Sequence, residues 1–352
     1  MKKKEAIIDI WRESFSDSDE YLDMFFSKVY RDEDALVLKD NGEIVSSMLL
    51  QRYAMNFHGA VVPISYVCGA ATRKSRRGTG CMCHLMHDAL KNSYARGDVF
   101  SVLIPANEWL FHYYEKFGYS PACYINVERY TSEHTFRHSG GYGQALDVGT
   151  DDAYAFFNDC MMRRNCCVQH TEEQYSQILM DNSVDGGAVI AVADNDGVIA
   201  AMAFAVPTDT SEVKVKDVLA RDTDSRNAVL GFVHDTFPGS SITVWGWYHD
   251  VPGALLARGM VRVVDVRKAL EIIAHQYPKM KGVFTIHDGC IESNNHTFRM
   301  RDGVVEVEDG RLVKPDYDID IEVFSSLLFG NDETRTLLDF PAVRPFISLM
   351  LD

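Results

Sequence analysis

Near the N-terminus, apolar and polar residues follow first a helical pattern and then a hairpin pattern. Between Ile7 and Tyr30, aromatic and aliphatic residues recur at helical intervals, and the polar run Ser16–Asp19 divides them into two helices. Asp40-Asn41-Gly42 then separates two apolar runs, which predicts a hairpin, and a second turn is expected at His58-Gly59. The chain is therefore expected to begin with two helices followed by antiparallel strands.

The next segment changes from strand to loop to helix and back to strand. Ile64–Ala71 is a small apolar run that predicts a buried strand, and Arg73–Gly80 is a basic loop containing glycines. From Thr79 onward apolar residues recur at helical spacing, and Val99–Pro105 predicts a second buried strand. A strand, a basic glycine turn and a helix start make an anion site, because the N–H groups of the turn and the positive end of the helix dipole point at one spot.

The basic loop supplies the candidate anion ligands. Gly78 and Gly80 let a phosphate approach the backbone closely, and Arg76 and Arg77 can add charge-assisted hydrogen bonds. No Lys-Ser or Lys-Thr pair follows the second glycine, so this is not a Walker loop, and the sequence GTG is not the GxGxxG of a dinucleotide-binding loop. The loop is expected to bind phosphate without belonging to either class.

The middle of the chain repeats part of this order. Ser139–Gly143 is rich in glycine and predicts a linker, and a pair of helices and a hairpin around Asp194–Gly197 follow it. Residues 194–202 align with residues 40–48, which favours a duplicated fold whose second copy starts near Gln144; two unrelated hairpins of a common type are the alternative. The second copy has no basic glycine loop, so it is not expected to bind the same ligand.

A third unit is expected from about Asp265, because strands and helices again alternate there. Its predicted elements are Arg267–Tyr277 (helix), Gly282–Asp288 and Thr297–Glu308 (strands), and Asp320–Phe329 and Glu333–Phe340 (helices). The final run Pro345–Asp352 is apolar, whereas chain ends are ordinarily polar and frayed. This tail is therefore expected to be buried.

Composition narrows the class of protein. A chain of 352 residues favours two or three domains, and 46% hydrophobic residues suffice for folded cores. A formal net charge of −16 argues against nucleic acid as a partner; it suits basic amine substrates, but solubility explains it equally well. The basic start has no long apolar region, and no later stretch has the length of a membrane span, which predicts a cytoplasmic protein without a membrane partner.

The eight cysteines lack the spacing of a metal site. Cys81 and Cys83 are too close for a zinc knuckle, and Cys166 and Cys167 are adjacent, so all eight are expected to be reduced and mostly buried. Two histidines near Cys81 suggest a metal at first sight, but no third ligand is evident. No metal is expected.

Further motifs connect the loop with a known family. Asn107 is followed seven residues later by Tyr114, which opens the run Tyr114-Glu115-Lys116-Phe117-Gly118-Tyr119. With the GTG turn after a strand, these residues resemble the GNAT acyltransferases, whose acetyl-CoA loop reads Arg/Gln-x-x-Gly-x-Gly/Ala; Ser75 stands where that family has Arg or Gln. The duplicated halves, the junction Met260–Leu270 and the segment Ile319–Gly330 resemble the "enhanced intracellular survival" acetyltransferases of this superfamily.

The resemblance implies a fold and an activity. The fold is α+β with mixed sheets: an acetyl-CoA-binding GNAT domain at 1–138, a degenerate GNAT-like domain at 139–264, and a sterol-carrier-like α+β domain at 265–352. The activity is acetyl-CoA-dependent N-acetyl transfer to a small cationic amine, such as an aminoglycoside or a polyamine, by a protein that often forms homo-oligomers. The alternatives are an acyltransferase acting on protein N-termini or lysines, and a non-catalytic protein that binds a lipid or coenzyme A.

The resemblance also implies roles for individual residues. A backbone N–H near Cys68, Gly69 and Ala70 would hold the thioester carbonyl. The other predicted acetyl-CoA ligands are Arg76, Arg77, Gly78, Thr79 and Gly80 for the diphosphate, and Asn107 for the pantetheine arm. The general acid would be Tyr119, as in the survival proteins, with Tyr114, the acid of ordinary GNAT enzymes, second; the base would be the terminal carboxylate of Asp352. Asp19, Glu20 and Phe26 of the first two helices are predicted to contact the acceptor.

Overall fold

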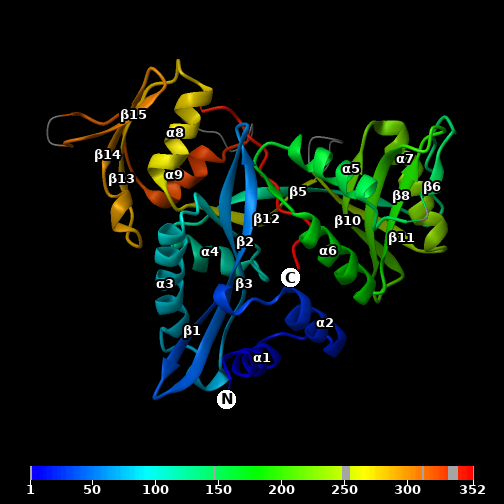
Figure 1. The fold of residues 1–352 in the computed structure, drawn as a ribbon, viewed down its shortest axis with the longest axis horizontal. Helices are drawn as coiled ribbons and strands as arrows, with labels where there is room; N and C mark the ends of the chain where they lie inside the picture. The colour runs from blue at the N-terminus through cyan, green and yellow to red at the C-terminus, as the bar shows by residue number, and fades with distance from the viewer. Residues whose placement is uncertain (1, 146, 248–253, 311–312, 332–339, 352) are drawn as a thin grey trace.

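The computed structural model describes residues 2–145, 147–247, 254–310, 313–331 and 340–351. In these residues one long sheet of twelve strands joins the first two thirds of the chain, and a separate sheet of four strands lies in the last third. Figure 1 shows three parts: α1 to β5, in blue and cyan, β6 to β12, in green, and α8 to the tail, in yellow to red. The first two parts share the long sheet and are called the N-terminal half and the second half below; the third is called the C-terminal unit. The mixed α/β fold class predicted from the sequence is confirmed.

The N-terminal half has the predicted order of elements. These are α1 (Lys3–Ser14), α2 (Asp19–Met24), β1 (Ala35–Asp40), β2 (Glu43–Phe57), β3 (Ala60–Thr72), α3 (Cys81–Arg96), β4 (Phe100–Leu103), α4 (Trp109–Glu115) and β5 (Ser120–Tyr130). The Ser18 hydroxyl caps α2 by accepting a hydrogen bond from the Tyr21 N–H. Helices α1 and α2 contribute their apolar side chains to one core cluster and α3 and α4 to another, so the helices cover both faces of the sheet.

The second half repeats the core of this order: two helices, three strands, a crossover helix and two further strands. Its elements are β6 (Gly143–Ala145), α5 (Asp151–Met162), β7 (Cys167–Gln169), α6 (Glu172–Val184), β8 (Ala188–Ala193), β9 (Ile199–Pro207), β10 (Glu212–Ala220), α7 (Thr223–Thr236), β11 (Ser241–Gly246) and β12 (Ala254–Val263). The turns around Gly42 and Gly197 join equivalent antiparallel pairs, β1–β2 and β8–β9. Strands β10 and β11 pair in parallel after a helical crossover, as β3 and β4 do.

Each half donates its last strand to the sheet of the other half. Strand β12, from the second half, lies between β4 and β5, and β5 lies between β12 and β11. Met260 of β12 faces Leu103 of β4, while Val127 of β5 faces Trp245 of β11. The two halves are thus joined by continuous backbone hydrogen bonding.

The C-terminal unit packs against the N-terminal half. It contains α8 (Val266–Gln276), β13 (Gly282–His287), β14 (Thr297–Arg301), β15 (Val304–Glu308), β16 (Tyr317–Asp320) and α9 (Ile321–Leu328). Fully buried Arg262 donates from Nη2 to Asp288 Oδ1 over 2.7 Å and from Nε to the Phe117 carbonyl over 2.6 Å. This network fixes the unit to the turn that follows α4. Of the helix predicted at 333–340, residues 333–339 lie outside the described part of the chain, and the sterol-carrier-like character of this unit stays a prediction.

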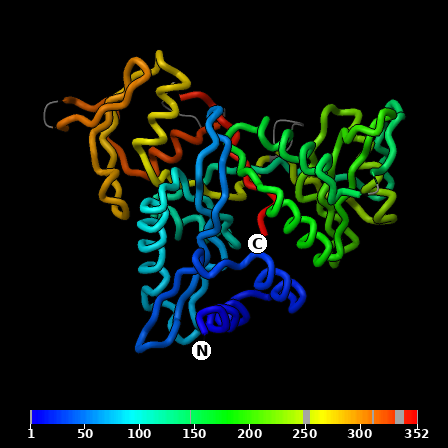
Figure 2. Tube along the Cα trace, viewed as in Figure 1, coloured from blue at the N-terminus to red at the C-terminus, as the bar shows by residue number. Residues whose placement is uncertain are grey.

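The described part of the C-terminal tail returns to the centre of the molecule, between α2 and α6 (Figures 1 and 2). The Phe346 N–H donates to the Cys166 carbonyl over 3.2 Å, and the Val168 N–H donates to the Phe346 carbonyl over 3.1 Å. Leu349 and Leu351 are buried. The predicted burial of the tail is confirmed up to Leu351.

Two further expectations concern the state of the cysteines and the presence of membrane-spanning helices. All eight cysteines are free, and six of them are buried. Across the described ranges, no helix combines the length and the apolar character that crossing a bilayer requires.

Candidate active site

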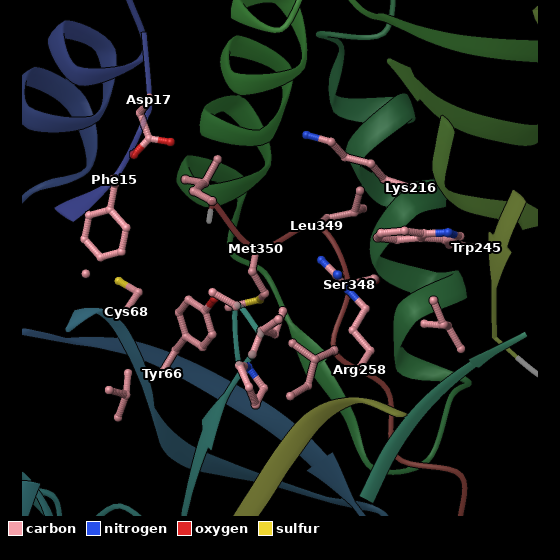
Figure 3. Close-up of a pocket in the computed structure, with 18 of the residues that line it drawn as sticks. Phe15, Asp17, Tyr66, Cys68, Lys216, Trp245, Arg258, Ser348, Leu349 and Met350 are labelled. Atoms are coloured by element: carbon pink, nitrogen blue, oxygen red, sulfur yellow. The ribbon is translucent and has the colours of Figure 1, made fainter. Parts of the chain in front are cut away.

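A cavity of about 570 Å³ lies where the two halves and the C-terminal tail meet (Figure 3). The N-terminal half contributes α1, the segment after it, β3, the segment after β4, α4 and β5; the second half contributes β9, β10, β11 and β12. The lining residues used below are Trp11, Phe15, Asp17, Cys68, Gly69, Ala70, Tyr114, Asp185, Lys214, Lys216, Trp245, Arg258 and Ser348–Leu351. The cavity is therefore a shared product of segments far apart in the sequence.

Strand β3 brings the predicted thioester-binding residues Cys68, Gly69 and Ala70 to the cavity wall. Strands β3 and β4 pair only as far as Val67 and Leu103, and then β3 continues while β4 ends. From Cys68 onward, the edge of β3 that faced β4 has no pairing with that strand, so its backbone groups can bind a ligand.

A bulge in β3 shapes the same wall. Leu49 and Ser47 of β2 face Cys68 and Ala71, so the bulged strand holds one extra residue. Gly69 adopts φ +57°, and a Cβ there would lie 2.2 Å from Trp11 Cζ3. Only glycine fits this position, because both the backbone conformation and the Trp11 ring exclude a side chain.

The basic loop leaves its backbone donors available. Gly78 and Gly80 adopt φ +78° and +85°, a Cβ added at either would meet nothing within 4 Å, and Gly80 directly precedes α3. The N–H groups of Gly78, Thr79 and Gly80 donate no hydrogen bond to any described residue. Free donors at a helix N-terminus are the geometry that an anion site requires, and the binding of a phosphate here stays a prediction.

The arginines of the loop are already engaged with the protein. Arg76 Nη2 pairs with Asp40 over 2.6 Å, and Arg77 donates to the Thr72 carbonyl and the Ser14 hydroxyl, both over 3.1 Å. The Thr79 hydroxyl donates to the Arg76 carbonyl over 2.7 Å. In this conformation the side chains of Arg76, Arg77 and Thr79 stabilise the loop, and the N–H groups of Gly78, Thr79 and Gly80 are its unused donors.

The two candidate acids occupy different environments. Tyr114 lines the cavity, and its hydroxyl makes no hydrogen bond with a described residue; burial raises the pKa of Tyr114 to about 12. Tyr119 is completely buried, does not line the cavity, and is hydrogen-bonded to the Ser101 hydroxyl over 2.7 Å. Burial raises the pKa of Tyr119 well above its ordinary value. The geometry brings Tyr114 to the cavity, and it places Tyr119 in the core.

The first helices wall the cavity through other residues than the predicted ones. Trp11, Phe15 and Asp17 line it, and the Trp11 Nε1–H donates to Asp17 over 2.6 Å. The predicted contacts do not: Asp19 and Glu20 are exposed, with Asp19 paired to Arg12, and Phe26 is buried with its ring 5.4 Å from that of Trp11. Of the two helices that the resemblance predicts at the acceptor site, α1 and the segment after it line the cavity, and α2 contributes no lining residue.

The second half contributes residues that the sequence analysis missed. Lys214 and Lys216 alternate along β10, Trp245 lies on β11, and Arg258 lies on β12. Burial opposes the charge of Lys216, but pairing with Asp181 and Asp185 raises its pKa. The alternation of lysine and valine from Lys214 was the available signal, since it predicts a strand with one charged face.

A buried network holds the tail in the cavity wall. Asp217 is fully buried and accepts hydrogen bonds from Arg164 Nη1 and from the Ser348 hydroxyl, each over 2.8 Å. His170 Nε2 donates to the Ser348 carbonyl over 3.2 Å. The ring of Phe346 lies 5.2 Å from the Arg164 guanidinium. The tail is therefore fixed by charged and polar partners as well as by its apolar side chains.

Because two histidines are buried, we expect the protein to lose stability in acid. Burial lowers the pKa of His58 and His170 from an ordinary 6.5 to about 4. Between these values the unfolded chain binds more protons than the folded protein, so the free energy of unfolding falls as pH decreases below 6.5. We expect a loss of about 2 kcal/mol per histidine at pH 5 relative to pH 7.5. Urea unfolding at both pH values measures it, with the double variant H58Q/H170Q as the reference; equal pH dependence in both proteins would contradict the prediction.

Two further predicted residues are not brought to the cavity. Asn107 is exposed in the turn before α4, and it is not among the lining residues. Asp352 lies outside the described residues, and Leu351 before it lines the cavity. In the described ranges, no group of three or more His, Cys, Asp or Glu side chains is placed to hold a metal ion.

Comparison with known proteins finds a family for the part of the chain that contains the basic glycine loop. Residues 2–122 match the family model described as an acetyltransferase (GNAT) domain. The N-terminal part of the chain is a GNAT acetyltransferase domain. This match supports an acyltransferase enzyme, as the sequence predicts. A search of curated proteins by sequence found no match.

Solved structures share the whole fold. Eis1 from Mycobacterium abscessus aligns with a TM-score of 0.72 and 15% identity over 94% of this chain and 88% of its own. A protein of unknown function from Enterococcus faecalis V583, described as a probable N-acyltransferase, aligns with a TM-score of 0.75 and 13% identity over 94% and 88%. A GCN5-related N-acetyltransferase from Kribbella flavida gives 0.75 and 15% over 99% and 95%. At these identities the likeness establishes the three-part fold alone.

Proposed function

We propose that this protein is an acetyl-CoA-dependent N-acetyltransferase that acts on a small amine. The observation that carries the proposal is the combination of the unpaired glycine loop with the parting of β3 and β4, both at the end of β3 that borders the cavity. The GNAT domain match covers this whole region. A cavity of about 570 Å³ built from three parts of the chain favours a small acceptor over a protein surface.

The loop and the strand bind different parts of acetyl-CoA. The diphosphate accepts hydrogen bonds from the N–H groups of Gly78, Thr79 and Gly80, helped by the dipole of α3. The backbone at Cys68–Ala70 polarises the thioester carbonyl. These contacts use the main chain, so Ser75 at the family's Arg/Gln position removes one side-chain contact and leaves the rest in place.

Acetyl transfer requires that a proton be removed from the amine and that another be donated to the leaving thiolate. The amine nitrogen attacks the thioester carbonyl carbon, and the carbon–sulfur bond breaks to leave a thiolate. Tyr114 gives the thiolate its proton; its pKa of about 12 keeps the hydroxyl protonated throughout the neutral range. Asp352 stays the predicted base. The degenerate character of the second GNAT-like half, the sterol-carrier-like third unit and assembly into homo-oligomers are proposed on the resemblance alone.

Replacing Gly80 with valine tests the proposed acetyl-CoA site. A side chain there occupies the space of the diphosphate, and we expect the dissociation constant for acetyl-CoA to rise tenfold to a hundredfold, that is by about 1–3 kcal/mol. The matched control is Gly197→Val, since Gly197 has a similar φ of +78° and equally open surroundings in the equivalent half. Calorimetric titration with acetyl-CoA measures both. Unchanged affinity in the Gly80 variant, or an equal loss of affinity in both variants, would show that the loop is not part of the acetyl-CoA site.

A further inference from the structure

One wall of the cavity is apolar, and it lies beside the proposed thioester site. Helix α1 and the segment after it supply Trp11 and Phe15, and the C-terminal tail supplies Met350 and Leu351. These four residues form the apolar wall. Trp11, Met350 and Leu351 belong to one core cluster and Phe15 packs against it, so the wall continues the core of the N-terminal half. Because the Trp11 ring lies against Gly69, the wall begins where the thioester carbonyl is proposed to bind.

The conformation of the tail brings two of its side chains to this wall. Leu349 has φ +56°, in the left-handed region that residues other than glycine rarely adopt. Its side chain packs in a core cluster built largely by the second half, whereas Met350 and Leu351 pack in the cluster that contains Trp11. Such a backbone conformation persists where the surrounding structure fixes it, and the hydroxyl of Ser348 is held in the buried network described above. The tail is thus fixed in the conformation that completes the apolar wall.

Most of the charged side chains that line the cavity come from the second half. Strands β10 and β12 and the end of α6 supply Lys214, Lys216, Arg258 and Asp185. Figure 3 draws Lys216, Trp245 and Arg258 on one side of the tail residues, and Phe15 and Cys68 on the other. The charged groups therefore lie across the tail from the proposed thioester site.

Asp17 is the one charged lining residue that the described part of the N-terminal half contributes. It is exposed, and its Oδ2 accepts a hydrogen bond from the Trp11 Nε1–H over 2.6 Å, while its Oδ1 accepts none from a described residue. A carboxylate next to the apolar wall attracts the ammonium form of an amine. This side of the cavity therefore combines one place for a positive charge with apolar surroundings.

We infer that the acceptor is a primary amine with an apolar body, an alkylamine or an arylalkylamine, whose body packs on the apolar wall while its nitrogen lies toward Cys68–Ala70. The inference rests on the proposed acetyl transfer. Each methylene removed from water favours binding, whereas a second charge or a set of hydroxyls against this wall would lose its water without gaining a partner. The acceptor thus differs from the polyamine or aminoglycoside expected from the net charge and the resemblance.

A series of amines of increasing length tests the apolar wall. Ethylamine, propylamine, butylamine and hexylamine share the reacting group and differ only in the number of methylenes. Thiol release from acetyl-CoA gives kcat/KM for each of them. We expect kcat/KM to rise by about threefold to fourfold for each added methylene, as for burial in an apolar site. A series that stays level or falls would overturn the inference.

A second set of amines changes the far end of the chain. Hexylamine, 1,6-diaminohexane and 6-aminohexanoate end in a methyl group, an ammonium and a carboxylate, and spermidine and kanamycin add the polycationic class. We expect kcat/KM for hexylamine to exceed that of every charged compound by about tenfold or more, because the apolar wall offers no partner to a second charge. A charged compound that equals or exceeds hexylamine would overturn the inference.

Variants of Phe15 separate recognition of the amine from effects on the protein. In Phe15→Ala, kcat/KM for hexylamine should fall by about tenfold, while kcat/KM for ethylamine and the affinity for acetyl-CoA change little. Phe15→Glu should lower the ratio of hexylamine to 1,6-diaminohexane by about tenfold, because it adds a charge that the far ammonium can pair with. Phe156→Ala is the matched control, since Phe156 is half-buried on α5 and is not a lining residue. An equal loss for ethylamine and hexylamine in Phe15→Ala would show that Phe15 acts on the protein itself and would contradict the inference.

The remaining outcomes distinguish the two proposals. Binding of acetyl-CoA without transfer to any of the alkylamines counts against the apolar acceptor and leaves the acetyl-CoA site standing. Absence of acetyl-CoA binding counts against the proposed function itself.

Discussion

Replacing Tyr114 with phenylalanine is expected to lower kcat by about 10²–10⁴-fold, the usual contribution of a general acid. The change removes one hydroxyl that faces the cavity and makes no hydrogen bond with a described residue, so folding and acetyl-CoA affinity should change little. Steady-state thiol release measures kcat, and calorimetry measures the affinity. Because burial raises the pKa of Tyr114 to about 12, the wild-type rate should show no alkaline decline from this group below about pH 11.

Tyr119→Phe is the matched control, and it decides between the two tyrosines. The hydroxyl of Tyr119 meets Ser101 inside the core, so its loss should cost about 1 kcal/mol of stability and leave kcat within a few-fold of the wild type. The survival-protein resemblance predicts the reverse order of effects. A large drop in kcat for Tyr119→Phe with normal activity in Tyr114→Phe would return the acid to Tyr119.

Replacing Asp217 with alanine should lower the free energy of unfolding by about 3–5 kcal/mol, because it leaves the Arg164 guanidinium buried without its carboxylate. The change also removes the acceptor of the Ser348 hydroxyl, so the tail should become easier to cleave by protease. Urea unfolding and limited proteolysis followed by mass spectrometry measure the two effects.

Two companion variants separate the tail from the ion pair. Ser348→Ala removes only the hydrogen bond of the tail and should cost about 1 kcal/mol. R164M/D217L replaces the pair with apolar side chains and should recover much of the stability lost in Asp217→Ala. If Asp217→Ala were as stable as the wild type, the buried network would not be what anchors the tail.

Local patterns in the sequence predicted much of the first half. The helices separated by Ser16–Asp19, the hairpin at Asn41-Gly42 and the strand–loop–helix around Gly80 each depend on residues close together in the chain, and all three are confirmed. The alignment of the Asp194 hairpin with the Asp40 hairpin likewise pointed to a repeated order, because a turn constrains its own few residues. Local signals of this kind are independent of how distant segments pack.

The residues that line the cavity are brought together by contacts between distant segments of the chain, and most of them were not predicted from the sequence. Phe26 and Trp11 both belong to apolar helical faces, and only the tertiary arrangement puts Trp11 against Gly69 and leaves Phe26 in the core. Lys214 and Arg258 meet at Trp245 because β12 crosses to the first half beside β5, which no local pattern encodes.

The exchange of β5 and β12 has a consequence for any attempt to divide the protein. A fragment ending near residue 138 would lack the neighbour of β4, and a fragment starting there would lack the neighbour of β11, so each would present an open sheet edge prone to aggregation. The repeats are thus obligate partners within one polypeptide, in the manner of an intramolecular domain-swapped dimer. A single repeat that kept this exchange would need a second copy of itself to complete the sheet.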